Sequence, residues 1–329
     1  MPENKTRVAV LVQNELNLDL NEVFHDAVAQ GAEIVNTPLY HTQDVQEVIA
    51  AAKGFDYVVA GREPWNAEVL SACADHLKGI ARFGAGFETV DLEKATELGI
   101  AVCNAPGVNA KAVAEQALAL TLAILRKITI YDRSLRADGV TAKMSQTLEG
   151  TVALLGFGNI GCEFAKLLSV FPVKVIAYDP YPNYQAANAL GVEIVDLETA
   201  VRTADIISLH LPAVKTMKDF ICKDVIDLMK DGVYIINTSR GYVVNEHDLA
   251  DALRSGKIAG AALDAFKVEP FDPDSELQTL PNVVLTPHSA AVSTQAVRMV
   301  FNHCASVIAS YMRGDQPRSL LNPEYAKHR

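Results

Sequence analysis

One short segment constrains the fold of this chain more than any other. The apolar run 152–155 is followed at once by three glycines in the spacing G-x-G-x-x-G, which are Gly156, Gly158 and Gly161. Glycines in this spacing allow a tight turn, a close approach of the backbone to a phosphate, and close packing of a helix on a strand. A helical pattern over residues 159–171 follows, and the free amides at its start favour an anion. The segment predicts the first βα unit of a dinucleotide-binding domain, with Asn159 and Ile160 also at the cofactor.

An acidic residue ends the next predicted strand. The apolar run 173–178 is followed directly by Asp179. A carboxylate there can bind the ribose hydroxyls of an adenosine and repel the additional phosphate of NADP. The alternative is that Asp179 is only a turn residue before Pro180. Because strand, glycines, helix, second strand and acid occur in this order, we expect NAD as the cofactor.

Short apolar runs alternate with helical patterns along the rest of the chain. The predicted strands are residues 7–12, 57–60, 77–83, 152–155, 173–178, 206–209, 233–237, 259–263 and 283–285. Helices are predicted at residues 245–255, with Asn245 and Gly256 as caps, and at residues 294–313. One long helix is predicted at residues 110–136 and would pass from one domain to the other. Apolar strands separated by helices predict an α/β fold with parallel sheets covered on both faces. A length of 329 residues predicts two domains.

Composition excludes several classes of function. The net charge of −11, with no long run of Lys or Arg, argues against a nucleic-acid partner. No apolar stretch reaches the length of a membrane span, and the run 8–12 is too short for a signal sequence. The five cysteines are scattered and form no C-x-x-C pair, so we expect neither a metal site nor a disulfide framework, and a cytoplasmic location.

Polar residues follow three of the predicted strands directly. The strand 233–237 leads into Thr238, Ser239 and Arg240; the strand 259–263 leads into Asp264 and then Glu269; the strand 283–285 leads into His288. Ligands of open parallel sheets bind at the carboxyl ends of the strands, so we expect these residues to meet at one site.

This set of side chains suits hydride transfer to a 2-keto acid. Arg240 offers a bidentate fork for a substrate carboxylate. His288 can give a proton to the carbonyl oxygen as hydride arrives, and Glu269 behind it would orient it and favour its protonated form. Taken singly, each has a simpler interpretation: a surface cation, a solvated acid, and a histidine satisfied beside a proline. The joint pattern favours catalysis.

At these residues the chain resembles the D-isomer-specific 2-hydroxyacid dehydrogenases, and within them the phosphoglycerate dehydrogenase-like branch. The matching segments occur in the family's order and span nearly the whole chain: residues 84–91, 113–118, 156–161, 210–212, 237–241, 262–264, 268–270 and 287–288. The resemblance implies two Rossmann-like, doubly wound domains with the active site in the cleft between them. The substrate domain would comprise residues 1–104 and 295–329, and the NAD-binding domain residues 105–294, in a homodimer.

The resemblance also implies roles for individual residues. Arg240 would bind the substrate, His288 would be the acid and base, and Glu269 its partner. The amides of Ala85 and Gly86 would hold the substrate carboxylate. The remaining implied contacts are to the cofactor, and they come from His210, Pro212, Thr238, Ser239, Arg240, His288 and Asp264, the last at the nicotinamide amide.

The identity of the keto acid stays open at this point. Arg62 and Arg82 follow or end two strands of the substrate domain, and two guanidinium groups there would suit a phosphate, as in D-3-phosphoglycerate. The alternative is that Arg62 pairs with Glu63 and that Arg82 is structural, as in a hydroxypyruvate or glyoxylate reductase. Glu88 and Thr89 replace the family's usual Asp-Asn, which affects the substrate fit.

Two other classes of protein were weighed. An NAD(H)-sensing binding protein of the corepressor type can keep the same three catalytic side chains, so the sequence argues only weakly against it. Formate dehydrogenases of this family carry glutamine where this chain has Glu269, which argues against that branch. No further domain follows Arg329 in this sequence, so we expect no feedback by serine through such a domain.

Overall fold

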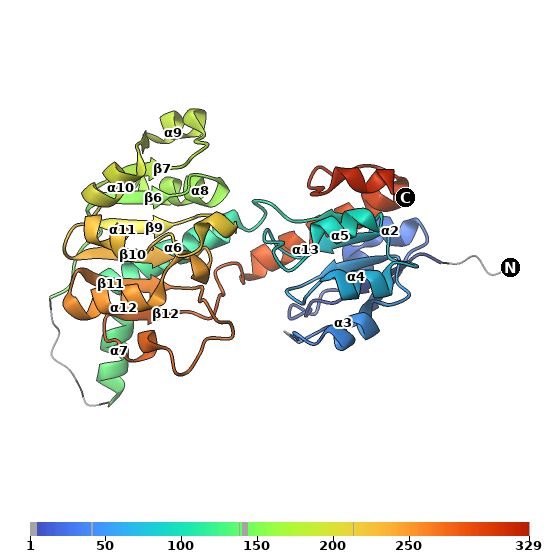
Figure 1. Ribbon diagram of the computed structural model, residues 1–329, viewed down its shortest axis with the longest axis horizontal. Helices are drawn as coiled ribbons and strands as arrows, with labels where there is room; N and C mark the ends of the chain where they lie inside the picture. Colours follow the sequence, from blue (N-terminus) through green and yellow to red (C-terminus); the bar gives the residue numbers. More distant parts are fainter. Residues whose placement is uncertain (1–4, 41, 138, 140–143, 213, 329) are drawn as a thin grey trace. The chain divides into compact units, whose positions relative to one another are not determined.

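The computed structural model describes residues 5–40, 42–137, 139, 144–212 and 214–328. The chain forms two compact units, which are Met1–Asn109 with Thr294–Arg329, and Ala110–Ser293. Each unit is an α/β layer structure on a parallel sheet, which confirms the predicted fold class. Figure 1 shows that the C-terminal helix, drawn in red, belongs to the same unit as the N-terminal strands, drawn in blue.

The first unit has a five-stranded sheet in the order β2-β1-β3-β4-β5. Its strands are β1 (Arg7–Val10), β2 (Glu33–Asn36), β3 (Tyr57–Ala60), β4 (Gly79–Arg82) and β5 (Ala101–Cys103). Its helices are α1 (Leu20–Val23), α2 (His25–Ala29), α3 (Val45–Ala52), α4 (Ala67–Cys73), α5 (Leu92–Glu97), α13 (Thr294–Arg313) and the 3-10 helix η4 (Pro323–Lys327).

Helices cover both faces of this sheet. On one face Ala27 of α2, Phe301 of α13 and Phe24, which precedes α2, form a core with the alternate residues of β1 and β3. On the other face α3, α4 and α5 pack on the remaining strand residues around the fully buried Trp65. Because side chains alternate between faces along a strand, two buried faces require the continuous apolar runs that the strands show.

The second unit has a seven-stranded sheet in the order β12-β11-β10-β9-β6-β7-β8. Its strands are β6 (Gly150–Leu155), β7 (Val173–Tyr178), β8 (Glu193–Ile194), β9 (Ile206–Leu209), β10 (Val233–Asn237), β11 (Ile258–Leu263) and β12 (Val283–Leu285). Its helices are α6 (Ala110–Leu125), α7 (Ile128–Ala137), α8 (Asn159–Leu168), α9 (Tyr184–Leu190), α10 (Leu197–Thr203), α11 (Lys223–Leu228), α12 (Glu246–Ser255) and the 3-10 helices η1 (Lys215–Met217), η2 (Gly241–Val243) and η3 (Glu276–Thr279).

The direction of chain progression reverses at the centre of this sheet. From β6 the chain builds β7 and β8 on one side, and then β9 to β12 on the other. The helices α10, α11 and α12 cover one face, and α6, α8 and α9 cover the other. Loops that leave β6 and β9 therefore diverge, which opens a binding crevice at the carboxyl ends of these two strands.

Three strands were missed in the sequence, and all three lie at a sheet edge. They are β2, β5 and β8. An edge strand pairs on one side only, so it can be short and half exposed. β8 has two residues, and neither is buried. β5 is short for another reason: its three residues are apolar and buried, but they are too few to mark a strand by themselves.

The prediction of one long helix over residues 110–136 is wrong. The helix α6 ends at Leu125, and α7 begins at Ile128, because Lys127 adopts a left-handed conformation with φ 55°. Residues far along the chain stabilise this break: the carbonyl of Leu125 accepts a hydrogen bond from the amide of Gln146 at 3.0 Å, and Nζ of Lys127 donates to the carbonyl of Met144 at 2.7 Å. The helix α6 also begins where the second unit begins and stays within it.

Of the other three predicted helices, α8 ends at Leu168 instead of residue 171, and the remaining two keep their ends. Asn245 caps α12 by accepting from the amide of Asp248 at 3.2 Å, and Gly256 ends it in a left-handed conformation with φ 81°. The helix α13 spans the predicted residues and stops before Gly314, with φ 78°. All five cysteines are free thiols. Across the part of the chain that the structure describes, no helix is both long and apolar enough to cross a membrane.

We predict that Phe301 is essential for the stability of the first unit. Its ring is fully buried and packs edge to face on Phe83, with ring centres 4.7 Å apart. Phe301→Ala should lower the free energy of unfolding by about 3–5 kcal/mol, because it leaves a cavity. Urea unfolding followed by the fluorescence of Trp65, the single tryptophan of the chain, measures this unit directly.

The matched control is Met299→Ala on the same helix. Met299 is 53% exposed, so its loss should cost no more than about 0.5 kcal/mol. Equal losses in the two variants would show that α13 is not part of the core of this unit.

Candidate active site

The glycine loop after β6 has the geometry that a bound pyrophosphate requires. Gly156 has φ 100°, and a Cβ placed on it would lie 2.4 Å from the carbonyl oxygen of His210. A Cβ on Gly161 would lie 2.5 Å from the carbonyl oxygen of Gly156. A Cβ on Gly158 would meet nothing within 4 Å. The first and third glycines are thus needed for packing, and the second leaves open space beside the loop for a ligand.

The start of α8 leaves amide donors beside that space. Gly158 is the N-cap of α8 and has no side chain that could accept from the first-turn amides. The amides that begin with Asn159 and Ile160 therefore face the loop with the positive end of the helix dipole. This arrangement fits the phosphates of a dinucleotide.

Asp179 lies next to the glycine loop. One oxygen of its carboxylate accepts from the amide of Phe157 at 2.8 Å, and the other accepts from the amide of Tyr181 at 2.8 Å. Each oxygen keeps a second lone pair, so the carboxylate can still accept from ribose hydroxyls. Its anchored position at the end of β7 fits the predicted role.

His210 was predicted to bind the cofactor, but its side chain is turned inward. The ring packs edge to face on Phe164, with centres 5.5 Å apart, and its Nε2 lies 3.0 Å from Oγ of Ser208. Its Nδ1 is enclosed and has no partner among the described residues. Burial lowers the pKa of His210 to about 3. The backbone of His210 abuts Gly156, and Pro212 after it is exposed.

The strands β10, β11 and β12 are neighbours in a parallel sheet, so the three predicted catalytic segments begin side by side at the carboxyl ends of these strands. Asn237 at the end of β10 is 1% exposed and folds the first of these segments. Its Oδ1 accepts from the amide and the hydroxyl of Ser239, at 3.0 and 2.8 Å, and its Nδ2 donates to the carbonyl of Arg240 at 3.0 Å. Thr238 beside them has a buried hydroxyl without a partner among the described residues, which fits a ligand at this edge.

The Arg240 and Glu269 segments are in direct backbone contact. A Cβ on Gly241 would lie 1.8 Å from the carbonyl carbon of Phe266, so only glycine fits there. The turn that begins at Phe266 is held further by Glu246 of α12, whose Oε1 accepts from the amide of Lys267 at 2.6 Å. The position of Glu269 therefore depends on the segments around β10 and α12.

Asp264 was predicted to contact the nicotinamide amide, and its carboxylate instead binds the His288 segment. Asp264 is 1% exposed. Its Oδ1 accepts from the hydroxyl of Thr286 at 2.5 Å and the amide of Ser289 at 2.9 Å, and its Oδ2 accepts from the amide of Ala290 at 2.8 Å. The carboxylate thus encloses His288 from both sides along the chain.

His288 and Glu269 form the pair that the sequence predicted. Nδ1 of His288 lies 2.7 and 2.8 Å from the two carboxylate oxygens of Glu269. The side chains are 21% and 28% exposed, so the pair is partly shielded from water yet open to a ligand. His288 has φ 51°, a strained conformation that the bonds of Asp264 on either side stabilise.

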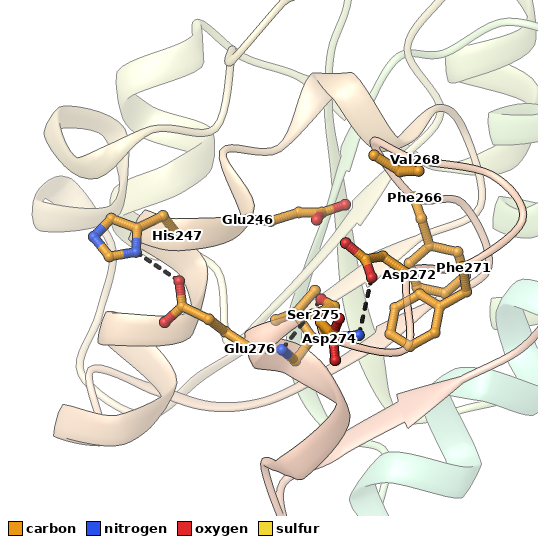
Figure 2. Close-up of a pocket in the computed structure, with 10 residues that line it drawn as sticks. Glu246, His247, Phe266, Val268, Phe271, Asp272, Asp274, Ser275 and Glu276 are labelled. Atoms are coloured by element: carbon orange, nitrogen blue, oxygen red, sulfur yellow. Dashed lines mark hydrogen bonds and ion pairs between the residues drawn. The ribbon is translucent and has the colours of Figure 1, made fainter.

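A pocket lies beneath the Glu269 segment, between α12 and η3 (Figure 2). His247 binds Glu276 there, with Nδ1 2.9 Å from Oε1, and this hydrogen bond raises the pKa of His247. Within the described residues, His247, Asp251 and Glu276 form one trio with the spacing of metal ligands. Arg254 donates to both carboxylates of this trio, at 2.9 and 2.7 Å, so a fixed cation already balances their charge.

The predicted substrate residues of the first unit divide into two groups. Ala85 and Gly86 lie in the loop after β4, half-buried, and Arg62 is exposed after β3. Arg82 is only 8% exposed. Its Nη1 donates inward to the carbonyl of Phe83, so its guanidinium lies under the loop.

Glu63 provides the opposite charge for Arg82. Its carboxylate is buried and accepts from the amide of Gly61 at 2.8 Å and from Nε1 of Trp65 at 3.1 Å. Burial raises the pKa of Glu63, and the charge of Arg82 opposes that rise. The sequence analysis considered Glu63 as a partner for Arg62, and the charge of Arg82 also acts on it.

Sequence reasoning missed the roles of Asn237 and Glu246. Asn237 could have been found, because it is a polar residue at the end of an apolar strand. Glu246 gave no such signal, because it is one of several acids at the start of a helix and its contact is 21 residues away in the chain.

The fold and the glycine loop define a dinucleotide-binding α/β protein, and comparisons with known proteins define its family. The family model described as D-isomer specific 2-hydroxyacid dehydrogenase, NAD binding domain, matches residues 118–290. A D-3-phosphoglycerate dehydrogenase of Archaeoglobus fulgidus is 40% identical over 268 residues, which are 80% of this chain and 51% of that protein. A glyoxylate reductase of Thermofilum pendens is 37% identical over 80% of each chain. The apo-structure of D-lactate dehydrogenase from Escherichia coli matches with a TM-score of 0.82 and 28% identity, over 96% of this chain and all of that one.

The chain therefore belongs to the D-isomer-specific 2-hydroxyacid dehydrogenases, a family of NAD-dependent oxidoreductases that act on hydroxyacids. The predicted family and the predicted cofactor, NAD, are confirmed. The matched part of the chain spans about half the length of the phosphoglycerate dehydrogenase and most of the glyoxylate reductase.

We predict that His210 makes the folded protein sensitive to acid. Its pKa is about 3 in the folded state and about 6.5 in an unfolded chain, so the unfolded state binds the proton more tightly. The contribution of neutral His210 to the free energy of unfolding is fully present above pH ~6.5. It is lost as the pH drops toward 3, by at most about 1.4 kcal/mol per pH unit for one proton. Urea unfolding between pH 7 and 4 should show a weaker dependence in His210→Asn than in the wild type.

The control is His25→Asn, because the side chain of His25 is 75% exposed. This variant should follow the wild-type curve. Parallel curves for His210→Asn and the wild type would mean that His210 binds its proton equally well in the folded and the unfolded state, so that folding does not lower its pKa.

Proposed function

We propose that this protein is an NAD-dependent D-2-hydroxyacid dehydrogenase that interconverts a small 2-keto acid and its D-2-hydroxy acid. The observation that carries the proposal is the His288–Glu269 pair, with Nδ1 held by both carboxylate oxygens. The pair follows the carboxyl ends of β11 and β12, next to the segment of Arg240 after β10, in the unit that matches the family's NAD-binding domain.

The hydrogen bonds of His288 assign its two nitrogens. With Nδ1 donating to Glu269, Nε2 is the atom that faces a substrate and can hold the transferable proton. During reduction Nε2 gives this proton to the carbonyl oxygen, and in the reverse direction it takes the hydroxyl proton. Glu269 fixes the orientation of the ring through Nδ1, so that Nε2 is the nitrogen that exchanges the proton.

Arg240 and the loop of the first unit would hold the substrate. The guanidinium of Arg240 can bind the carboxylate in a bidentate manner, and it polarises the carbonyl as negative charge develops there. The amides of Ala85 and Gly86 would bind the same carboxylate. The bound nicotinamide supplies the hydride during reduction and accepts it during oxidation.

The substrate that we propose is a keto acid without a phosphate, of the hydroxypyruvate or glyoxylate type. Of the two arginines that could hold a phosphate, Arg82 is buried, donates to the backbone of Phe83 and faces the acid Glu63. A phosphate on Arg82 would therefore have to enter the interior beside a buried carboxylate, which is unfavourable. The phosphate hypothesis then depends on Arg62 alone.

Two further features belong to the proposal. We propose a homodimer, which the family resemblance implies, and a cytoplasmic location, which the free cysteines support. A wild-type protein that binds NADH but reduces none of glyoxylate, hydroxypyruvate, pyruvate and phosphohydroxypyruvate would instead fit an NAD(H)-sensing binding protein.

His288→Ala should lower kcat for keto-acid reduction by about 10²–10⁴-fold, the usual contribution of general acid catalysis. NADH affinity, measured by fluorescence titration, should change little. His25→Ala, at an exposed position of the first unit, should keep wild-type kcat. Near-normal turnover by His288→Ala would remove His288 from the mechanism.

The substrate proposal predicts that the wild type has a higher kcat/KM for glyoxylate or hydroxypyruvate than for phosphohydroxypyruvate. Arg62→Ala should then change each kcat/KM by no more than about threefold, in line with a peripheral charge. Arg318→Ala, at another exposed arginine of the same unit, serves as the control. A wild-type preference for phosphohydroxypyruvate that Arg62→Ala cuts by about 10–150-fold, the effect of one lost charged contact of roughly 1.5–3 kcal/mol, would instead establish a phosphate site.

A further inference from the structure

The loop after β4, residues 83–86, is fixed in an unusual way. Three successive carbonyl groups each accept a hydrogen bond: that of Phe83 from Nη1 of Arg82, that of Gly84 from the amide of Ala105 at 2.9 Å, and that of Ala85 from Nδ2 of Asn104 at 2.6 Å. All of these donors belong to β4 or to the segment that follows the neighbouring strand β5. The carbonyls of Phe83, Gly84 and Ala85 are therefore all engaged with their own unit.

The amide groups of the same loop are not all alike: those of Phe83 and Gly84 donate to the carbonyls of Ala60 and Arg82, at 2.7 and 2.9 Å. The N–H groups of Ala85 and Gly86 donate to no other group among the described residues, although both residues are half-buried. A trans peptide is planar, and its N–H and C=O point in opposite directions. The bond to the Gly84 carbonyl thus fixes the direction of the Ala85 amide, and the bond to the Ala85 carbonyl fixes that of the Gly86 amide. Successive free amides of this kind form a concave site for an anion.

We propose that Asn104 is a positioning residue for the substrate carboxylate. Its side chain turns the Gly86 amide toward the anion, beside the Ala85 amide that the bond from Ala105 to Gly84 fixes. The inference rests on the proposed function and adds a residue that touches neither substrate nor cofactor. Nδ2 of Asn104 is the only side-chain donor that reaches the Ala85 carbonyl among the described residues.

Asn104 is itself held rigidly. It is 7% exposed, and its own carbonyl accepts from Nε2 of His303 on α13 at 2.8 Å. Its amide donates to the carbonyl of Ser319 at 3.4 Å. A side chain anchored in this way can transmit an orientation, whereas a mobile one cannot. The C-terminal helix and the segment after it thereby fix the geometry of a loop more than 200 residues earlier in the chain, as the separation of 222 between Cys304 and Arg82 also shows.

The chain contains a second buried asparagine that separates positioning from stability. Asn322 is 4% exposed and lies in the same unit. Its Nδ2 donates to the carbonyl of Ile100 at 2.9 Å, and its Oδ1 accepts from the amide of Val102 at 2.8 Å. These bonds tie the C-terminal segment to β5 and do not reach the loop. Asn322→Ala removes comparable hydrogen bonds and leaves the anion site intact.

The test compares Asn104→Ala, Asn104→Asp and Asn322→Ala in steady-state reduction of glyoxylate or hydroxypyruvate with NADH. Asn104→Ala should raise KM, and the inhibition constant of oxalate, by about 10-fold, with kcat within about threefold, because substrate binding is lost while proton transfer is kept. Asn104→Asp keeps the size of the side chain, cannot donate to the carbonyl, and adds a negative charge, so it should raise KM further. Asn322→Ala should lower the unfolding midpoint without changing KM.

A second measurement begins with the wild-type holoenzyme, and this first part does not depend on the folding of a variant. With NADH bound, oxalate should slow hydrogen exchange at the amides of Ala85 and Gly86 relative to chloride at the same ionic strength. Asn104→Asp should lose this protection. The absence of protection in the wild type would overturn the proposal, and so would an unchanged KM in the Asn104 variants.

The two proposals fail in different ways. A wild type that reduces no keto acid, but whose Ala85 and Gly86 amides oxalate protects, would refute the proposed function and keep the anion site. If the wild type reduces keto acids but Asn104→Ala and Asn322→Ala raise KM equally, the role of Asn104 is refuted and the proposed function is kept.

Discussion

A parallel sheet brings the carboxyl ends of its strands to one edge, and the backbone groups of the loops that begin there have no strand to bind. Buried backbone groups must still form hydrogen bonds. In this protein an Asn or Asp at or directly after the strand provides them: Asn104 after β5, Asp179 after β7, Asn237 at the end of β10, and Asp264 after β11. Asp179 anchors the glycine loop, Asn237 and Asp264 anchor the segments after β10 and β12, and Asn104 anchors the loop after β4.

The chemistry of each anchor matches what its loop offers. Asp264 and Asp179 are pure acceptors, and each binds amide groups of a turn. Asn104 uses its amide nitrogen as a donor, because its loop presents a carbonyl. Asn237 has both kinds of group in its turn, and it accepts from Ser239 while it donates to Arg240. A carboxylate at position 104 or an amide at 264 would leave a buried group unpaired.

The side chains that we propose to react are not themselves the anchors. They lie on the segments that the anchors hold by hydrogen bonds. Asp264 holds the segment that carries His288, Asn237 holds the turn that carries Arg240, and Glu246 holds the turn before Glu269. Reacting side chains must be held within a fraction of an ångström of their working position. The anchoring side chains are buried or form short hydrogen bonds, whereas the side chains of His288 and Glu269 stay exposed enough to contact a ligand.

Local patterns of apolar runs and turn residues predict the α/β class, most of the strands, the glycine loop, and the polar residues that follow β10, β11 and β12. Features that depend on partners far along the chain leave no such pattern and became apparent in the folded structure. The break at Lys127 exists because residues near 145 bind there, and the edge strands exist because a neighbour pairs with them. The sequence placed Arg82 and His210 beside the ligands, whereas packing turned Arg82 beneath the loop and the ring of His210 into the unit. The direction of a side chain at the end of a strand depends on which face has a partner for it, and no local pattern records that.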